Sequence, residues 1–223
     1  MINQVINFRD AQLYDSDVAL FTEFMWLNDN AIHFYFAYLH QYVCNESTRV
    51  LFADPAVVSC LLLQCDDDQD LKEMTCGWKL HEKELCFFPV NNRQSFEEYG
   101  SHWSLIVFRK NEKGLEHYDS SEPLNEAAAI RTCDMLRRVF QLSTDDDEVL
   151  RSADVNYGII KRSCAQQANE YDCGMHVLLV AEYLTKAHFK SVNCSLQEYV
   201  SPMKIRERRL EIPSLIKRLQ ENA

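Results

Sequence analysis

The chain has 223 residues, of which 47% are hydrophobic, and a formal net charge of −11. This composition is sufficient for a full core, and the acidic balance disfavours nucleic acid and anionic membranes as partners. The sequence has no apolar run of about 18 residues that would span a bilayer and no apolar signal core near its start, so we expect an intracellular protein, cytoplasmic, nuclear or both.

Cysteine, glycine and proline usage bear on redox compartment and domain number. Nine cysteines, an odd number without regular spacing, favour reduced and mostly buried thiols over a disulfide framework. Gly and Pro number five each, and no linker-like stretch interrupts the chain. We therefore expect a single domain over residues 1–223, with residues 1–14 as the candidate for a loose amino-terminal segment. We expect the protein to be a monomer.

The first part of the chain carries the patterns of two helices. Asn28 and Asp29 are N-cap candidates, and apolar residues then recur at helical spacing. These apolar residues are Ile32, Tyr35, Phe36, Leu39 and Val43. Asp54 followed by Pro55 predicts the start of a second helix, because proline suits the first helical position. The acidic run at 66–70 is expected to be a solvated loop.

The middle of the chain carries strand patterns. Short apolar runs predict four strands, at 85–91, 102–108, 115–119 and 155–161. A helical pattern over 125–140 has one apolar stripe, Ala129, Cys133, Leu136 and Phe140. A second acidic run, at 145–148, is expected to be a solvated loop like the first.

The last part returns to helix, from residue 174 to about 188, and Ser195 is the cap candidate for a further helix. Pro202 and Pro213 are expected to break the tail into short helical pieces. The basic run KIRERR at 204–209 is interleaved with acid and is expected to be a solvated helix face. Helices thus flank a middle block of strands, which predicts an α+β domain.

Cys173 stands where the polar loop at 166–172 meets the apolar helix. The unpaired backbone N–H groups and the dipole of a helix N-terminus stabilise a thiolate, which is the nucleophilic form of cysteine. Taken alone, the position fits a small buried hydrophobe at least as well. That is what we expect of most other cysteines, such as Cys60, Cys65 and Cys86 in their apolar runs.

A nucleophilic cysteine needs a base, and the predicted hairpin offers one. If strands 102–108 and 115–119 pair antiparallel about Lys110 and Asn111, His102 lies opposite Asp119 and the two side chains can hydrogen-bond. An imidazole oriented by a carboxylate is the base half of a nucleophilic triad. Each residue also has an ordinary interpretation, as a strand-end histidine and as a turn cap.

The loop before Cys173 offers amides that can stabilise an oxyanion. Gln166 and Gln167 are the first candidates and Asn169 is a rival donor. For a metal, the only spacing of interest is that of Cys76, His81 and Cys86, which lacks a CxxC pair and a fourth ligand. No glycine-rich nucleotide loop is present. We therefore expect neither a metal nor a cofactor.

Four motifs together resemble a known family. WLND (26–29), HWSL (102–105), YDS (118–120) and QQANEYDCGM (166–175) stand in the order and spacing of the Ulp-type cysteine proteases, which cleave SUMO and related ubiquitin-like modifiers. The resemblance runs from about residue 15 to the end of the chain. It implies an α+β, papain-like fold of the Ulp type, with a central twisted mixed sheet flanked by helices.

The resemblance also implies roles for individual residues. His102 matches the general base, Asp119 its orienting acid and Cys173 the nucleophile. Gln167 matches the oxyanion glutamine. Residues matching the channel for the diglycine tail of the modifier are Trp26, Trp103 and, as the acid that seats the tail, Asp29.

Within the family the chain looks most similar to the deneddylase branch, which acts on the Nedd modifier. The protease motifs fill nearly the whole chain, and ten residues, 92–101, separate the strand at 85–91 from HWSL, where SUMO proteases have only a few. Cys164, His176 and the segment 66–84 depart from the pattern.

The resemblance implies precursor processing, deconjugation or both, with the modifier and its conjugates as partners. The alternatives are a protease for SUMO or ubiquitin, a catalytically silent module that binds such modifiers, and a cysteine acetyltransferase of related fold. The intact catalytic residues disfavour the silent module. The tryptophans of the tail channel would have no purpose in the acetyltransferase.

Overall fold

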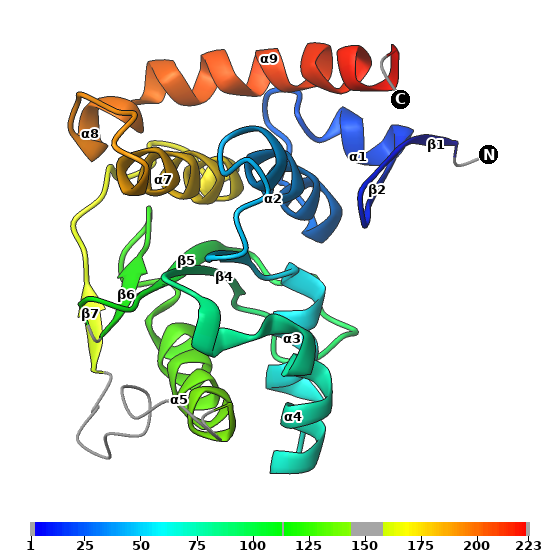
Figure 1. Cartoon of the computed structure of the whole chain (residues 1–223). Helices are drawn as coiled ribbons and strands as arrows, with labels where there is room; N and C mark the ends of the chain where they lie inside the picture. Colours follow the sequence, from blue (N-terminus) through cyan, green and yellow to red (C-terminus); the bar gives the residue numbers. More distant parts are fainter. Residues whose placement is uncertain (1–2, 113, 144–157, 222–223) are drawn as a thin grey trace. The chain divides into compact units, whose positions relative to one another are not determined.

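A computed structural model of the chain describes residues 3–112, 114–143 and 158–221 (Figure 1). The chain divides into two compact units, unit 1 (Met1–Glu46 and Cys164–Ala223) and unit 2 (Ser47–Ser163), and each is described by itself. The single domain expected over residues 1–223 stays a prediction. The acidic run at 145–148 and residues 155–157 of an expected strand lie outside the described residues.

Unit 2 is built on a mixed sheet. Five strands of the described chain form it in the order β3-β4-β5-β6-β7, with parallel pairs at both edges and antiparallel pairs in the middle. The strands are β3 (Val50–Phe52), β4 (Leu85–Asn91), β5 (Trp103–Arg109), β6 (Gly114–Tyr118) and β7 (Ile159–Lys161). Every residue of β4 is buried, which agrees with its uninterrupted apolar run.

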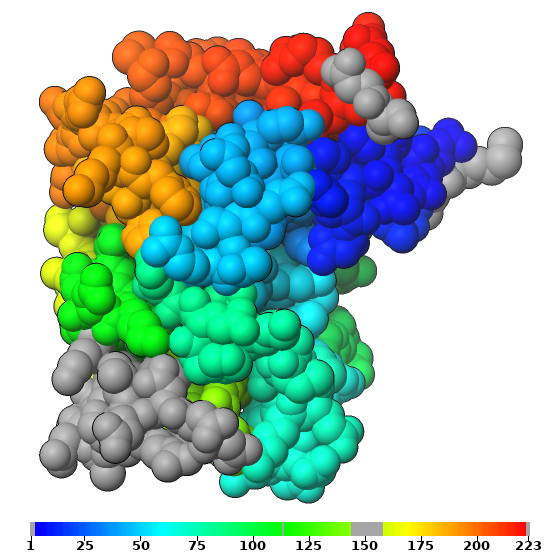
Figure 2. All heavy atoms as spheres, in the orientation of Figure 1, coloured from blue at the N-terminus to red at the C-terminus, as the bar shows by residue number. Residues whose placement is uncertain are grey.

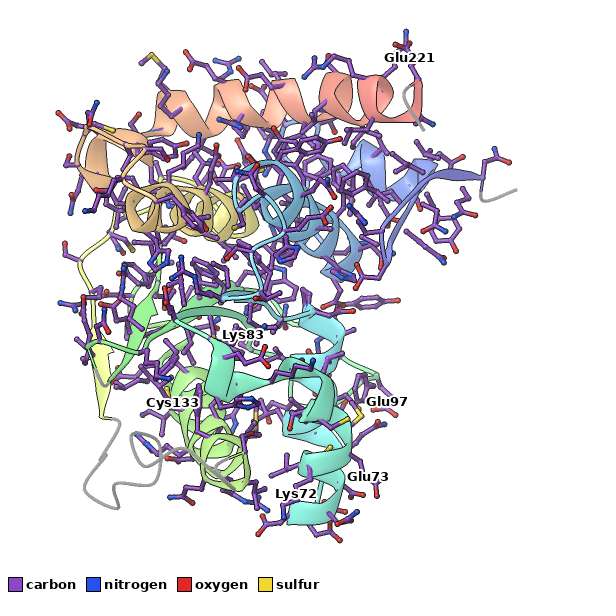
Figure 3. The ribbon with its side chains drawn as sticks, viewed as in Figure 1. Lys72, Glu73, Lys83, Glu97, Cys133 and Glu221 are labelled. Atoms are coloured by element: carbon purple, nitrogen blue, oxygen red, sulfur yellow. The ribbon has the colours of Figure 1, made fainter. Side chains whose placement is uncertain are left out.

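Helices cover this sheet and complete the core of unit 2. They are α3 (Pro55–Leu63), α4 (Asp68–Thr75), α5 (Glu126–Leu142) and the short turns η1 (Cys76–Trp78) and η2 (Leu80–Glu82). Helices α3 and α5 contact β4, and the expected stripe of α5 is buried, including Cys133, which Figure 3 labels on that helix. The expected α+β architecture, a mixed sheet flanked by helices, is therefore confirmed.

Two expectations for unit 2 are corrected. The run at 66–70 is not a loop throughout, because Asp67 caps α4 and Asp68 and Asp70 occupy its first turn, where acids favour a helix. Figure 3 shows Lys72 and Glu73 of this helix. The hairpin register is also two residues away from the expected one, since Leu105 lies opposite Tyr118.

Unit 1 is mostly helical. It contains a hairpin, β1 (Gln4–Phe8) and β2 (Ala11–Tyr14), followed by α1 (Asp15–Ala19), α2 (Asp29–Tyr42), α7 (Cys173–His188), α8 (Leu196–Tyr199) and α9 (Pro202–Glu221). The expected loose segment is therefore paired from Gln4 to Tyr14. The caps fall where the sequence predicts them, since the side chain of Asn28 caps α2 and that of Ser195 caps α8.

The carboxyl-terminal helix α9 contradicts the expected break into short pieces. Pro202 is its first residue, where a missing N–H costs nothing, and Pro213 lies inside a continuous helix. A buried stripe at helical spacing, Ile205, Arg209, Ile212 and Ile216, offsets the lost hydrogen bond. Figure 2 shows the side chains of α9 packed closely on the rest of unit 1, in which α9 contacts α7 and β1.

A buried acid joins three helices of unit 1. Glu182 of α7 accepts hydrogen bonds from Tyr35 of α2 at 2.8 Å and from Lys186 at 2.7 Å, and Arg208 of α9 lies 3.3 Å from the same carboxylate. Burial alone raises the pKa of Glu182, but Arg208 and Lys186 outweigh it and hold that pKa below its usual value.

No helix among the described residues combines the length and apolar character needed to cross a bilayer.

Candidate active site

The two halves of the predicted triad belong to different units, and each half is built within its own unit. In unit 2, Nε2 of His102 lies 2.6 Å from Oδ1 of Asp119, and both side chains are buried. The contact survives the two-residue error in register because a shift of two keeps both side chains on the same face of the sheet, as diagonal neighbours.

The Asp119 carboxylate is held by further hydrogen bonds. Oδ1 accepts the N–H of Ser121 at 2.9 Å, so Asp119 is also the turn cap that its ordinary interpretation predicts, and Oδ2 accepts the N–H of Asn125 at 3.1 Å. Burial alone raises the pKa of Asp119, but the bonds from His102, Ser121 and Asn125 outweigh it and keep the pKa below its usual value. Asp119 is therefore ionised and fixed in direction.

Asn125 is a buried residue beside the His102–Asp119 pair that sequence reasoning missed. Its side-chain amide donates to the carbonyl of Val90 at 3.0 Å and to Oγ of Ser104 at 2.9 Å, while its backbone N–H holds Asp119. It is fully buried, just before α5. An asparagine at the end of the turn that follows YDS is the only signal in the sequence, and a helix cap is the usual interpretation of such a residue.

The ten-residue loop 92–101 is tied at its base to His102. Oδ1 of Asn92 accepts the N–H groups of Ser101 at 2.7 Å and of His102 at 3.2 Å. Gly100 closes the loop with a φ of +64°, and a Cβ there would collide with the Asn91 side chain. Beyond this base the loop exposes its side chains, above all Tyr99, and Figure 3 labels Glu97 on it.

In unit 1, Cys173 is the first residue of α7, as the sequence predicts. The next residue is glycine, and a Cβ on Gly174 would lie only 2.9 Å from Cβ of Leu27, so that any larger residue would force a shift. Leu27 is the second residue of WLND, so this close approach packs the WLND turn against the start of the Cys173 helix. The two motifs of unit 1 are thus one local structure.

The three candidate oxyanion donors in the loop before Cys173 differ in their hydrogen-bond partners. Asn169 is committed to the turn, since its Oδ1 accepts the N–H groups of Tyr171 and Asp172 and its Nδ2 donates to Asp172. Gln166 donates to the carbonyl of Cys164 at 3.3 Å. Gln167 donates from Nε2 to the carbonyl of Asn169 at 2.5 Å.

The residues predicted to form the tail channel differ in exposure. Trp26 is 47% exposed, and Asp29 begins α2 directly after the Asn28 cap. Trp103 is the first residue of β5 and is 4% exposed. Trp103 directly follows His102, so its side chain points to the other face of the sheet, and the burial agrees with that direction.

Cys86 is a buried core thiol, as expected, and so are Cys44 and Cys133, whereas Cys60 and Cys65 are only half-buried. Burial raises the pKa of Cys44 and of Cys133 to about 12 and also raises that of Cys86. Cys76 and Cys194 are exposed, so the expectation of burial does not extend to them. Among the described residues no group of three His, Cys, Asp or Glu side chains is arranged to hold a metal ion.

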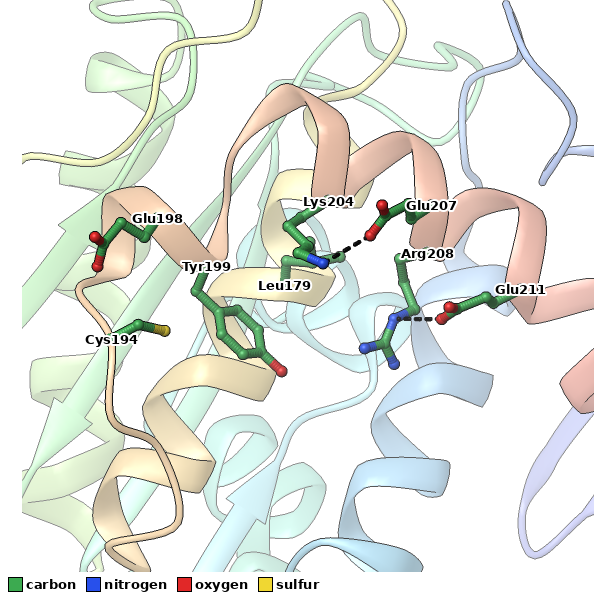
Figure 4. Close-up of a pocket in the computed structure, with 8 residues that line it drawn as sticks. All are labelled: Leu179, Cys194, Glu198, Tyr199, Lys204, Glu207, Arg208 and Glu211. Carbon is green, nitrogen blue, oxygen red and sulfur yellow. Dashed lines mark hydrogen bonds and ion pairs between the residues drawn. The ribbon is translucent and has the colours of Figure 1, made fainter.

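A separate pocket of unit 1, of about 380 Å³, has none of the predicted catalytic or tail-channel residues in its lining (Figure 4). Its lining is Leu179, Cys194, Glu198, Tyr199, Lys204, Glu207, Arg208 and Glu211. Four of the charged groups are paired with one another, Lys204 with Glu207 at 2.8 Å and Arg208 with Glu211 at 3.3 Å. The carboxylate of Glu198 instead accepts hydrogen bonds from Ser195, the N-cap residue of α8.

Comparison with known proteins decides the family. Residues 25–206 match the Ulp1 protease family, C-terminal catalytic domain. The chain belongs to the Ulp1 protease family. The match spans WLND, HWSL, YDS and the cysteine loop, so the resemblance seen in the motifs extends over most of the chain and makes it a cysteine peptidase by descent.

Two relatives of this Ulp1-family protease align over almost their whole length. The human sentrin-specific protease 8 is 27% identical over 95% of this chain and 95% of its own. The NEDD8-specific protease 1 of Arabidopsis thaliana is 26% identical over 99% of this chain and 96% of its own. The C-terminal Ulp1 protease domain, solved in complex with the yeast SUMO orthologue SMT3, covers 97% of this chain and 87% of its own, with 19% identity and a TM-score of 0.73. This last likeness confirms the Ulp-type fold.

Proposed function

We propose that the chain is a thiol peptidase and isopeptidase that cleaves after the C-terminal diglycine of a Nedd-type modifier, in precursors, in conjugates or in both. The observation that carries the chemistry is the buried His102–Asp119 pair, an imidazole held by an ionised carboxylate. Cys173 is the proposed nucleophile because it begins a buried helix, where a thiolate is stabilised.

The proposed reaction uses both nitrogens of His102. Since Nε2 is bonded to Asp119, we assign Nδ1 as the atom that takes the proton of the Cys173 thiol. The thiolate attacks the carbonyl carbon of the last glycine, and an amide N–H of Gln167 stabilises the oxyanion. The amine leaves with the proton from His102, and a water molecule deprotonated by the same imidazole hydrolyses the thioester and restores the thiol.

The Nedd-type choice is supported by the relatives whose names include sentrin-specific protease 8 and NEDD8-specific protease 1. The long loop 92–101 supports it as well, because its exposed Tyr99 and flanking acids form an adaptable contact surface next to the base. The second candidate is a SUMO-type modifier, because the chain is similar in fold to a protease solved in complex with SMT3. We further propose a monomeric, intracellular enzyme, cytoplasmic, nuclear or both.

The tail of the modifier sets a second requirement. We propose that Trp26 and Trp103 line a slot that admits only glycine, with Asp29 seating the tail, so that a Cβ next to the cleaved bond is excluded. Cleavage rates on precursors ending in Gly-Gly, Gly-Ala and Ala-Gly before the cut test the slot. We expect a sharp fall in kcat/KM for both alanine tails, and for the natural tail in a folded Trp26→Ala variant. Comparable rates on all three tails would assign the enzyme to a broader substrate class.

The modifier itself is tested with a panel of probes. The Nedd-type modifier, SUMO and ubiquitin, each with a C-terminal electrophile, are incubated with the protein and with a Cys173→Ser control. We expect the Nedd-type probe to attach fastest, and only when Cys173 is present. Preferential attachment of SUMO would replace the modifier and keep the mechanism, whereas attachment of no probe would reject the proposed function.

A further inference from the structure

Arg209 of α9 is almost fully buried, with 1% of its surface exposed. Such burial is unusual for an arginine. The expected solvated helix face at 204–209 is wrong at this position. Nε and Nη2 of Arg209 donate to Oδ1 of Asp172 at 3.1 and 2.8 Å, and Nη2 also donates to the carbonyl of Tyr171 at 3.2 Å. Asp172 directly precedes Cys173 and is the N-cap residue of its helix.

The third nitrogen of the same guanidinium holds a different part of the chain. Nη1 donates to the carbonyls of Leu20 at 2.8 Å, Thr22 at 3.0 Å and Met25 at 3.1 Å. These carbonyls belong to the segment 20–26, which ends in the exposed Trp26. Within the segment Phe24 has a φ of 67°, a conformation that residues with a side chain seldom adopt unless their surroundings impose it.

One planar side chain therefore links two elements that the proposed reaction needs together. Arginine presents five N–H donors in a rigid fork, and here every nitrogen of that fork has an acceptor, on the cap of α7 or on the segment 20–26. A lysine would carry the same charge, but its single nitrogen reaches far fewer of these acceptors.

We propose that Arg209 is a positioning residue, which fixes the segment carrying Trp26 against the start of the Cys173 helix. The proposal rests on the proposed function, since it gives Trp26 a role in binding the tail. Arg209 touches no reacting atom. Its effect reaches the reaction through the place of Trp26 relative to Cys173, and a misplacement of about 1 Å near a reacting group costs about 10²-fold in rate.

The first test needs no substrate. Amide hydrogen exchange is measured over residues 20–26 in the wild type, in Arg209→Lys and in Arg209→Met. Arg206→Met is the matched control, because Arg206 lies one turn away on α9 and contacts Glu23 of the same segment, but through an exposed ion pair. We expect exchange over 20–26 to accelerate by about tenfold or more in both Arg209 variants and to stay unchanged in the control.

The second test is kinetic, with the Nedd-type substrate. We expect kcat/KM to fall by about 10²-fold in Arg209→Lys, with both kcat and KM changed, and little in Arg206→Met. The variant Arg209→Lys/Trp26→Ala should be no worse than Trp26→Ala alone, because Arg209 acts through Trp26. A residue that only stabilises the fold would give additive losses instead.

The outcomes separate this proposal from the proposed function. Wild-type exchange over 20–26 in Arg209→Lys, or additive kinetic losses, would overturn the positioning role. If Arg209→Met does not fold, Arg209→Lys decides, since it keeps the buried charge of Asp172 paired. If the wild type attaches to no modifier, the proposed function fails by itself, and the exchange experiment still shows whether Arg209 fixes the segment.

Discussion

Gly174→Ala tests the contact between the WLND turn and the helix that begins at Cys173. The added Cβ would lie 2.9 Å from Cβ of Leu27, whereas ordinary contacts begin at 3.4 Å, so Leu27 must move by about 0.5 Å. Overpacking of this kind costs about 1–3 kcal/mol, and the better helix propensity of alanine returns up to about 1 kcal/mol. The net loss therefore lies between about 0 and 3 kcal/mol and lowers the unfolding midpoint by at most about 12 °C.

The same displacement carries Trp26 away from the start of α7. Since a misplacement of about 1 Å costs about 10²-fold, half that distance is expected to lower kcat/KM by about tenfold. The assay combines thermal unfolding with cleavage of the modifier precursor. Gly77→Ala is the matched control, because a Cβ on Gly77 meets no atom within 4 Å. Full activity in Gly174→Ala, with Gly77→Ala also active, would show that the close approach has no part in catalysis.

The remaining predictions concern the proposed catalytic residues and the loop. Cys173→Ser should abolish both turnover and attachment of modifier probes, while Cys164→Ser leaves both largely intact; the opposite result would reassign the nucleophile. Asp119→Asn should lower kcat by up to about 10⁴-fold and Gln167→Ala by about 10²–10³-fold, and wild-type kcat in either folded variant would remove that residue from the mechanism. Folding lowers the pKa of Asp119, so its contribution to stability is complete above its ordinary pKa of about 3.9 and is lost as the pH falls through the lowered value. The stability of Asp119→Asn towards denaturation should therefore depend less on pH below about pH 4 than that of the wild type. Shortening the loop between residues 93 and 100, with its base kept, should weaken Nedd-type binding without changing the attachment rate of a small alkylating reagent; unchanged kcat/KM would show that the loop makes no contact.

Sequence patterns predicted the elements that carry the proposed chemistry because local signals are strong there. The apolar run of β4 and the caps Asn28, Asp54 and Ser195 needed only near neighbours to be interpreted correctly. The hairpin register was wrong because it depends on the turn between β5 and β6, which the sequence of the strands does not specify. The His102–Asp119 pair was still found, because the error of two residues kept the side chains on one face.

The misses share a different cause, which is long-range pairing. Arg209 looks like a surface residue in KIRERR, since its acceptors lie at positions 20–25 and at 172, far away in sequence. Asn125 looks like a helix cap for the same reason. Pro213 predicts a break only if the helix is considered alone, because the buried stripe of α9 becomes visible only with its packing partners.

The division of the chain has a consequence for its synthesis. Unit 2 is one continuous stretch, whereas unit 1 is interrupted after residue 46 and resumes at residue 164. On the ribosome, unit 2 is complete before α7 is made, and Arg209 is made later than Cys173. We therefore expect the nascent chain to hold an ordered His102–Asp119 pair before the Cys173 helix can pack on α2. A newly made copy of this protease would then gain activity only after α9 has been made.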